Sequence, residues 1–140
     1  MPELLSPEHF AALIPRLFLG MLFFFQGFDA LFTIGLKDIG ETYRSAFAEK
    51  GIPNILTSAG ILFTTLTELF GGLLLVFGIY RYYTLYILGA NLLAATMAFS
   101  IVKPMWDTKH VFPRLAVLTF LMLLPTHWDI YSLDHLIFNP

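Results

Sequence analysis

The chain has 140 residues, of which 57% are hydrophobic and 13% charged, and its formal net charge is −2. Soluble domains carry about 25% charged residues, so this composition, with a mean hydropathy of +0.73, favours a membrane protein over a soluble one. The charge balance argues against a nucleic-acid partner, and the absence of Cys excludes thiol–disulfide chemistry and thiolate metal sites within this chain.

Four apolar runs predict membrane-spanning helices, because a helix needs about 20 mainly apolar residues to cross a bilayer. We place the spans at about residues 12–36, 55–80, 82–102 and 111–131 of a single domain that covers residues 1–140. The fourth run is the weakest, because Pro125 would kink or end its helix. The acidic N-terminal segment does not resemble a signal peptide, so we expect the first run to be retained.

Two polar segments separate the runs. Residues 37–54 place apolar side chains at helical spacing among charged ones, which predicts a short amphipathic helix on the membrane surface, ended by Gly51 and Pro53. Residues 103–110 form the second polar loop. The predicted fold class is therefore all-α: an integral membrane four-helix bundle with a short amphipathic helix between the first and second spans.

The basic residues are unevenly distributed about these spans. Arg16 and Arg81 lie on one side of the membrane in this arrangement. All the others lie on the side of the two polar loops: Lys37, Arg44, Lys50, Lys103, Lys109 and Arg114. The positive-inside rule then places both termini outside. We expect Arg16 and Arg81 to be snorkelling anchors at helix ends, or to meet an anionic headgroup or a partner subunit.

Thr119 lies near the middle of the fourth predicted span. Polar side chains also lie near the middle of the other three, at Gln26, Glu68 and Asn91, and Asp29 follows one turn after Gln26. Each lies on a stripe of polar or small residues, so we expect the stripes to face one another inside the bundle. Two interpretations of Glu68 stay open. It either holds helices together through hydrogen bonds, or it is a ligand or proton site, since ionisable residues within membranes are costly. Asp29, a second acid at similar depth, could share a proton with it.

The segment THWDIYSLDH, residues 126–135, contains two His and two Asp side chains. Imidazole and carboxylate can bind metals, but this spacing matches no strong metal-binding pattern. We therefore interpret the segment as a solvated helix terminus and predict no metal site. Every His lies outside the apolar centres, which argues against axial haem ligation within the bundle.

Three stretches of the chain carry a family resemblance: RLFLGMLFFFQGFDALF, ELFGGLLLVFGIYRY and YSLDHLIF. Their order and spacing resemble the DoxX family of small bacterial four-helix membrane proteins, over nearly the whole chain. By this resemblance Glu68 matches the acid of the second helix, Asp134 the terminal Asp, and Arg16 and Arg81 the basic positions. The chain departs from the family at Asp29, where Lys is common.

The resemblance implies a bacterial cytoplasmic (inner) membrane, contact with the lipid bilayer and protein partner subunits, because the broader family includes a membrane subunit of thiosulfate:quinone oxidoreductase. We expect a subunit associated with a redox complex, without a covalently bound cofactor, in which Gln26, Glu68 and Asn91 bind a quinone headgroup. Glu68 and Asp29 would handle its protons, and another protein would supply the electrons. Two alternatives stay open: a structural or assembly subunit without chemistry, and a small transporter or ion pathway.

Overall fold

The computed structural model describes residues 2–102 and 109–138. The predicted polar loop at 103–110, with Lys103, therefore falls largely outside the described residues. Within them the chain is all-helical, without a strand. Three helices are long and apolar enough to cross a membrane: Pro7–Ile34, Asn54–Phe77 and Arg81–Val102. The all-α membrane class predicted from the apolar runs is thus confirmed.

The first membrane-length helix consists of two parts. A short 3-10 turn, η1 (Pro2–Leu5), precedes α1 (Pro7–Phe28), and α1 continues without a break into the π-helical segment η2 (Asp29–Ile34). Gly35 ends it with a φ of 89°, a backbone conformation that side-chain-bearing residues rarely adopt. The next helix, α2 (Leu36–Glu49), starts directly after this turn and buries Phe47. Whether α2 lies on a membrane surface stays a prediction.

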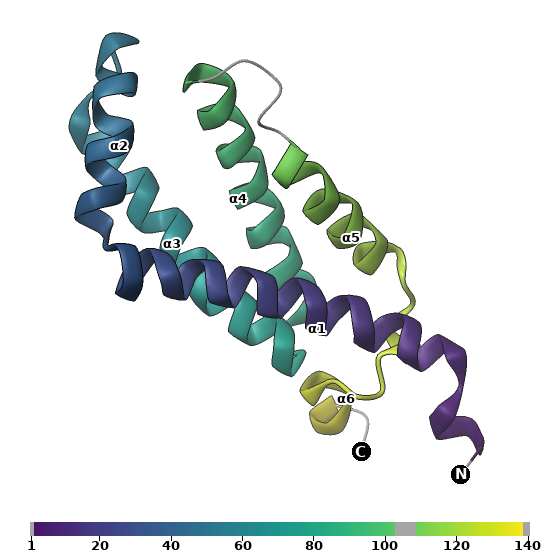
Figure 1. The fold of residues 1–140 in the computed structure, drawn as a ribbon. Helices are drawn as coiled ribbons and strands as arrows, with labels where there is room; N and C mark the ends of the chain where they lie inside the picture. The colour runs from purple at the N-terminus through teal and green to yellow at the C-terminus, as the bar shows by residue number, and fades with distance from the viewer. Residues whose placement is uncertain (1, 103–108, 139–140) are drawn as a thin grey trace.

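The two central helices are joined by a tight turn. Helix α3 (Asn54–Phe77) ends at Gly78, which has a φ of 67°, and the Ile79 amide bonds back to the Leu74 carbonyl at 2.9 Å. This left-handed cap is a common helix ending. Helix α4 (Arg81–Val102) begins almost at once, so α3 and α4 run antiparallel as neighbours (Figure 1).

The fourth apolar run does not form one continuous helix over 111–131. Helix α5 (Val111–Leu123) has 13 residues, and Leu124 is extended with a ψ of 135°. Pro125 explains this ending, because its ring disfavours helical backbone at the preceding residue. A 3-10 turn, η4 (Thr126–Trp128), and the short helix α6 (Leu133–Phe138) complete the described chain.

Helices α1 and α3 cross closely because both carry glycines at their contact. A Cβ atom on Gly72 of α3 would collide with the backbone of Phe24 on α1, and one on Gly27 of α1 would collide with Leu69. Small residues permit such an approach in membrane bundles. The two ends of the chain lie on the same side of the molecule (Figure 1), where His9 Nδ1 is 3.0 Å from the Trp128 carbonyl oxygen.

Candidate functional site

The buried carboxylate of Glu68 joins three helices. Glu68 lies on α3 with 4% of its surface exposed. Its Oε1 accepts hydrogen bonds from Gln26 Nε2 on α1 at 3.2 Å and from Asn91 Nδ2 on α4 at 3.4 Å. Both bonds are longer than the usual value of about 2.9–3.0 Å. The structure therefore brings together three of the four side chains expected near the middle of the spans, in a loose arrangement. The fourth, Thr119, is exposed and donates to the Leu115 carbonyl oxygen of its own helix.

Two amide oxygens of this group have no hydrogen-bond donor. Gln26 Oε1 and Asn91 Oδ1 are buried and unpartnered among the described residues. Buried polar atoms are normally paired, and an unpaired one costs about 1–3 kcal/mol. The group thus presents acceptor oxygens and lacks O–H donors. Each of the two oxygens can accept a hydrogen bond, either from a protonated Glu68 or from a donor group of a bound molecule.

A fourth helix adds a positive charge to the same region. Arg114 on α5 lies near enough to Glu68 for the two charges to interact, although they form no direct ion pair. Its guanidinium carbon lies 6.0 Å from the centre of the Phe23 ring on α1. Sequence reasoning counted Arg114 only among the loop-side cations. We define the Glu68 cluster as Gln26, Glu68, Asn91 and Arg114, one residue from each of α1, α3, α4 and α5.

Asp29 does not join the Glu68 cluster. It is the first residue of η2 and lies exposed on the outer surface of the helix. Its Oδ1 accepts a hydrogen bond from Thr33 Oγ1 of the same segment at 3.1 Å. No hydrogen bond joins Asp29 to Glu68 in the described part of the chain, so the structure does not bring the two acids together as the sequence suggested.

A second polar cluster lies where the ends of the chain meet. Arg16 on α1 is 1% exposed and Asp129, between η4 and α6, is 3% exposed. Arg16 Nε donates to Asp129 Oδ1 at 3.1 Å, and its other nitrogens donate to the carbonyl oxygens of Leu75, Val76 and Tyr131. These bonds tie α1 to the end of α3 and to the C-terminal segment.

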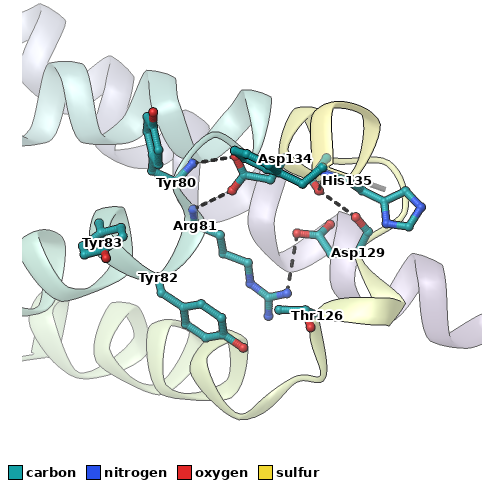
Figure 2. Close-up of a pocket in the computed structure, with 10 residues that line it drawn as sticks. Tyr80, Arg81, Tyr82, Tyr83, Thr126, Asp129, Asp134 and His135 are labelled. Atoms are coloured by element: carbon teal, nitrogen blue, oxygen red, sulfur yellow. Dashed lines mark hydrogen bonds and ion pairs between the residues drawn. The ribbon is translucent and has the colours of Figure 1, made fainter. Parts of the chain in front are cut away.

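Arg81 approaches the same aspartate from α4. It is 5% exposed, its Nη1 lies 3.6 Å from Asp129 Oδ2, and its Nη2 donates to the carbonyls of Leu121 and Leu124 at the end of α5. Figure 2 shows the guanidinium pointing inward toward Asp129. One carboxylate thus faces two buried guanidinium groups, and we call Arg16, Arg81 and Asp129 the arginine cluster.

Asp134 holds the start of α4 beside this cluster. Its Oδ1 and Oδ2 accept hydrogen bonds from the amides of Tyr80 at 2.9 Å and Arg81 at 3.0 Å (Figure 2). Tyr80 has a φ of 48°, which is uncommon for a residue with a side chain. The two bonds also place a negative charge at the positive end of the helix. A pocket of about 320 Å³ opens here, lined in part by Tyr82, Asp134 and His135.

Two interpretations made from the sequence are wrong at this cluster. Arg16 and Arg81 are not snorkelling anchors, because both side chains are buried and turned toward Asp129. The segment 126–135 is not simply a solvated terminus, because Asp129 and Ser132 are buried. A buried Asp is expected only where it is paired. The two arginines, far from Asp129 in the sequence, were the signal from which this pairing could have been predicted. Within the described residues, no three His, Asp or Glu side chains gather as metal ligands.

The fold and its membrane-length helices define an all-α, multi-pass integral membrane protein. The chain belongs to the DoxX family, whose model matches residues 11–103. No curated protein and no solved structure matches the chain. The match includes Arg16, Glu68 and Arg81, whereas Arg114 and Asp129 lie beyond its end.

Proposed function

We propose that this DoxX protein is a membrane subunit of a redox complex, in which the Glu68 cluster binds a quinone headgroup and handles its protons. The unpartnered oxygens of Gln26 and Asn91 carry this proposal. They are acceptors on two side chains that both donate to Glu68 Oε1, and the hydroxyl groups of a quinol are donors that such oxygens can accept.

The chain's own residues would then have separate roles. Gln26 and Asn91 accept hydrogen bonds from hydroxyls through their oxygens and can offer their amide N–H groups to carbonyls. Glu68 Oε1 holds or releases a proton, and Arg114 on α5 places a positive charge in the same region. A quinone interconverts with its quinol by taking up two electrons and two protons, and a partner protein would exchange the electrons. Asp29 would act only as an outer proton acceptor.

Co-purification tests this proposal. The protein is purified in mild detergent from membranes that contain quinone, and the organic extract is analysed by mass spectrometry. Glu68→Gln removes the ionisable group, and Thr65→Val is the control, because Thr65 is also buried on α3 but forms no hydrogen bond with the cluster. We expect wild type and Thr65→Val to retain quinone and Glu68→Gln to retain about tenfold less. Quinone-free wild type, or equal retention in Glu68→Gln, would overturn the proposal.

One observation favours a second candidate, a structural or assembly subunit. Glu68 joins α1, α3 and α4 through its two hydrogen bonds, which is what a helix-tying residue does. In that case Glu68→Gln lowers the thermal stability of the bundle and leaves electron transfer in the assembled complex unchanged. Measuring both quantities on the same variant separates the two candidates.

We also propose a topology. Helix α5 is the fourth, shorter membrane-embedded helix, α2 lies along the membrane surface, and both termini face outward from a bacterial cytoplasmic membrane. Lys37 and Arg44 on α2 and Lys109 before α5 support this orientation through the positive-inside rule. A reporter protein that fluoresces only in the cytoplasm, fused to the C-terminus, should stay dark because this terminus lies outside. Fluorescence of the fusion would reverse the proposed orientation.

A further inference from the structure

A pocket of about 210 Å³ lies between α2 and the start of α3, away from both clusters. Its lining combines two cations, one hydroxyl and three aliphatic side chains: Lys37, Arg44, Ser58, Leu36, Ile61 and Leu62. The polar and the apolar groups come from both helices. Such a lining suits a ligand that has an anionic end and an apolar end.

The two cations share one face of α2. Lys37 and Arg44 are about two helical turns apart, so their side chains point the same way. Gly40, between them, is buried under the Arg44 side chain, and a Cβ atom on Gly40 would lie 3.2 Å from Arg44 Nη2. The glycine therefore lets the guanidinium fold back against α3, where Arg44 Nη2 donates to Ser58 Oγ at 3.1 Å.

The two cations of this pocket lack a direct counter-ion among the described residues. Neither Lys37 nor Arg44 forms an ion pair in residues 2–102 and 109–138. Asp38 and Glu41, the acids nearest on the same helix, are exposed. Arg44 Nε is buried and has no hydrogen-bond partner within this part of the chain. A guanidinium held in place beside a second cation in the pocket lining is suited to a phosphate oxygen.

The position of the pocket indicates where that phosphate comes from. Leu36 directly follows the end of the first membrane-length helix at Ile34, and Ser58 lies near the start of the second, which begins at Asn54. In the topology proposed above, the pocket is thus at the depth where the spans leave the apolar layer. Ile61 and Leu62 continue along α3 toward the membrane centre. A free phosphate would leave this apolar wall unused, whereas an acyl chain would cover it.

We propose that Lys37, Arg44 and Ser58 bind the phosphate of an anionic phospholipid, whose acyl chain lies against Ile61 and Leu62. The bound lipid would fix α2 to the membrane surface at its junction with α1. This inference does not depend on the proposed function of the Glu68 cluster, because it uses none of its residues.

Native mass spectrometry of the purified full chain tests the proposal with phosphatidylglycerol as the probe and diacylglycerol as the matched lipid without phosphate. We expect wild type to retain phosphatidylglycerol and not diacylglycerol. A hydrogen bond between a charged side chain and a bound phosphate contributes about tenfold to affinity. Lys37→Gln should therefore lower retention about tenfold, and the double variant with Arg44→Gln about a hundredfold.

Lys50→Gln is the control, because it removes the same charge from an exposed position just after α2, outside the pocket. Equal losses in Lys50→Gln and Lys37→Gln would show general surface attraction and overturn the site. Equal retention of both lipids would also overturn it. Displacement of the lipid by excess inorganic phosphate would identify a free phosphate as the ligand and contradict the lipid assignment.

Discussion

Asp129 receives a hydrogen bond at 3.1 Å from Arg16, 113 residues earlier in the chain, and both side chains are almost fully buried. Arg81 shares the same carboxylate at 3.6 Å. Breaking a buried ion pair by removing one partner is costly, because the other charge stays buried without compensation. The arginine cluster is therefore the place where a single substitution should affect the whole bundle.

Asp129→Asn should destabilise the protein strongly. The amide preserves the shape but leaves Arg16 and Arg81 buried without a counter-charge, a change that costs about 3–5 kcal/mol in comparable sites. Thermal unfolding in detergent, followed by circular dichroism, measures the effect. Asp38→Asn, the same exchange at an exposed site on α2, is the control and should unfold like wild type. Equal stability of the two variants would contradict the role given to Asp129.

Asp134→Ala should have a smaller effect than Asp129→Asn. It removes two hydrogen bonds to the amides of Tyr80 and Arg81 at the start of α4. Loss of a helix-capping side chain costs about 0.5–2 kcal/mol. Hydrogen exchange at the first turn of α4 should increase while the end of that helix stays protected. Unchanged exchange at Tyr80 and Arg81 would show that the cap is not needed.

Gly72→Ala should loosen the contact between α1 and α3. The new methyl group would meet the Phe24 backbone and lie 2.7 Å from the Gly20 carbonyl oxygen, neither of which can rotate away. Overpacking of this kind costs about 1–3 kcal/mol. Gly60→Ala is a matched control on α3, because a Cβ atom there meets nothing within 4 Å. We expect its melting temperature to equal or exceed that of wild type, and a similar drop in both variants would rule out the close-contact explanation.

Asp29→Asn should change quinone retention less than Glu68→Gln does. Asp29 is exposed, and among the described residues its carboxylate accepts a hydrogen bond only from Thr33, whereas Glu68 is buried among three helices. The same extraction assay applied to both variants compares them directly. A loss in Asp29→Asn as large as that in Glu68→Gln would mean that the two acids act as one unit despite their separation.

The long helices and the meeting of Gln26, Glu68 and Asn91 could be anticipated from the sequence. Apolar runs define spans by length, and helical spacing indicates which residues share a face. When adjacent spans run up and down, residues at similar depth on facing stripes come close. The two amide bonds to Glu68 follow from that geometry.

The arginine cluster could not be anticipated in this way. Periodicity gives the face of a helix but not the path of the chain after Pro125, and it is this path that brings Asp129 between Arg16 and Arg81. An arginine at a helix end beside tyrosines has the pattern of an interfacial anchor. The turn at Gly78–Tyr80 directs Arg81 inward. Gly78 and Tyr80 have positive φ angles in this turn, which the sequence pattern does not predict. The length of α5 likewise depended on whether the apolar run or Pro125 determines where the helix ends.

The pairing of Arg16 with Asp129 also sets an order of events during synthesis. A ribosome makes Arg16 and Arg81 long before it makes Asp129, so both guanidinium groups enter the nascent bundle without their counter-ion. Until the segment after α5 packs between them, this end of the bundle carries two buried charges without a counter-ion. A chain interrupted before Asp129 would keep these two charges uncompensated.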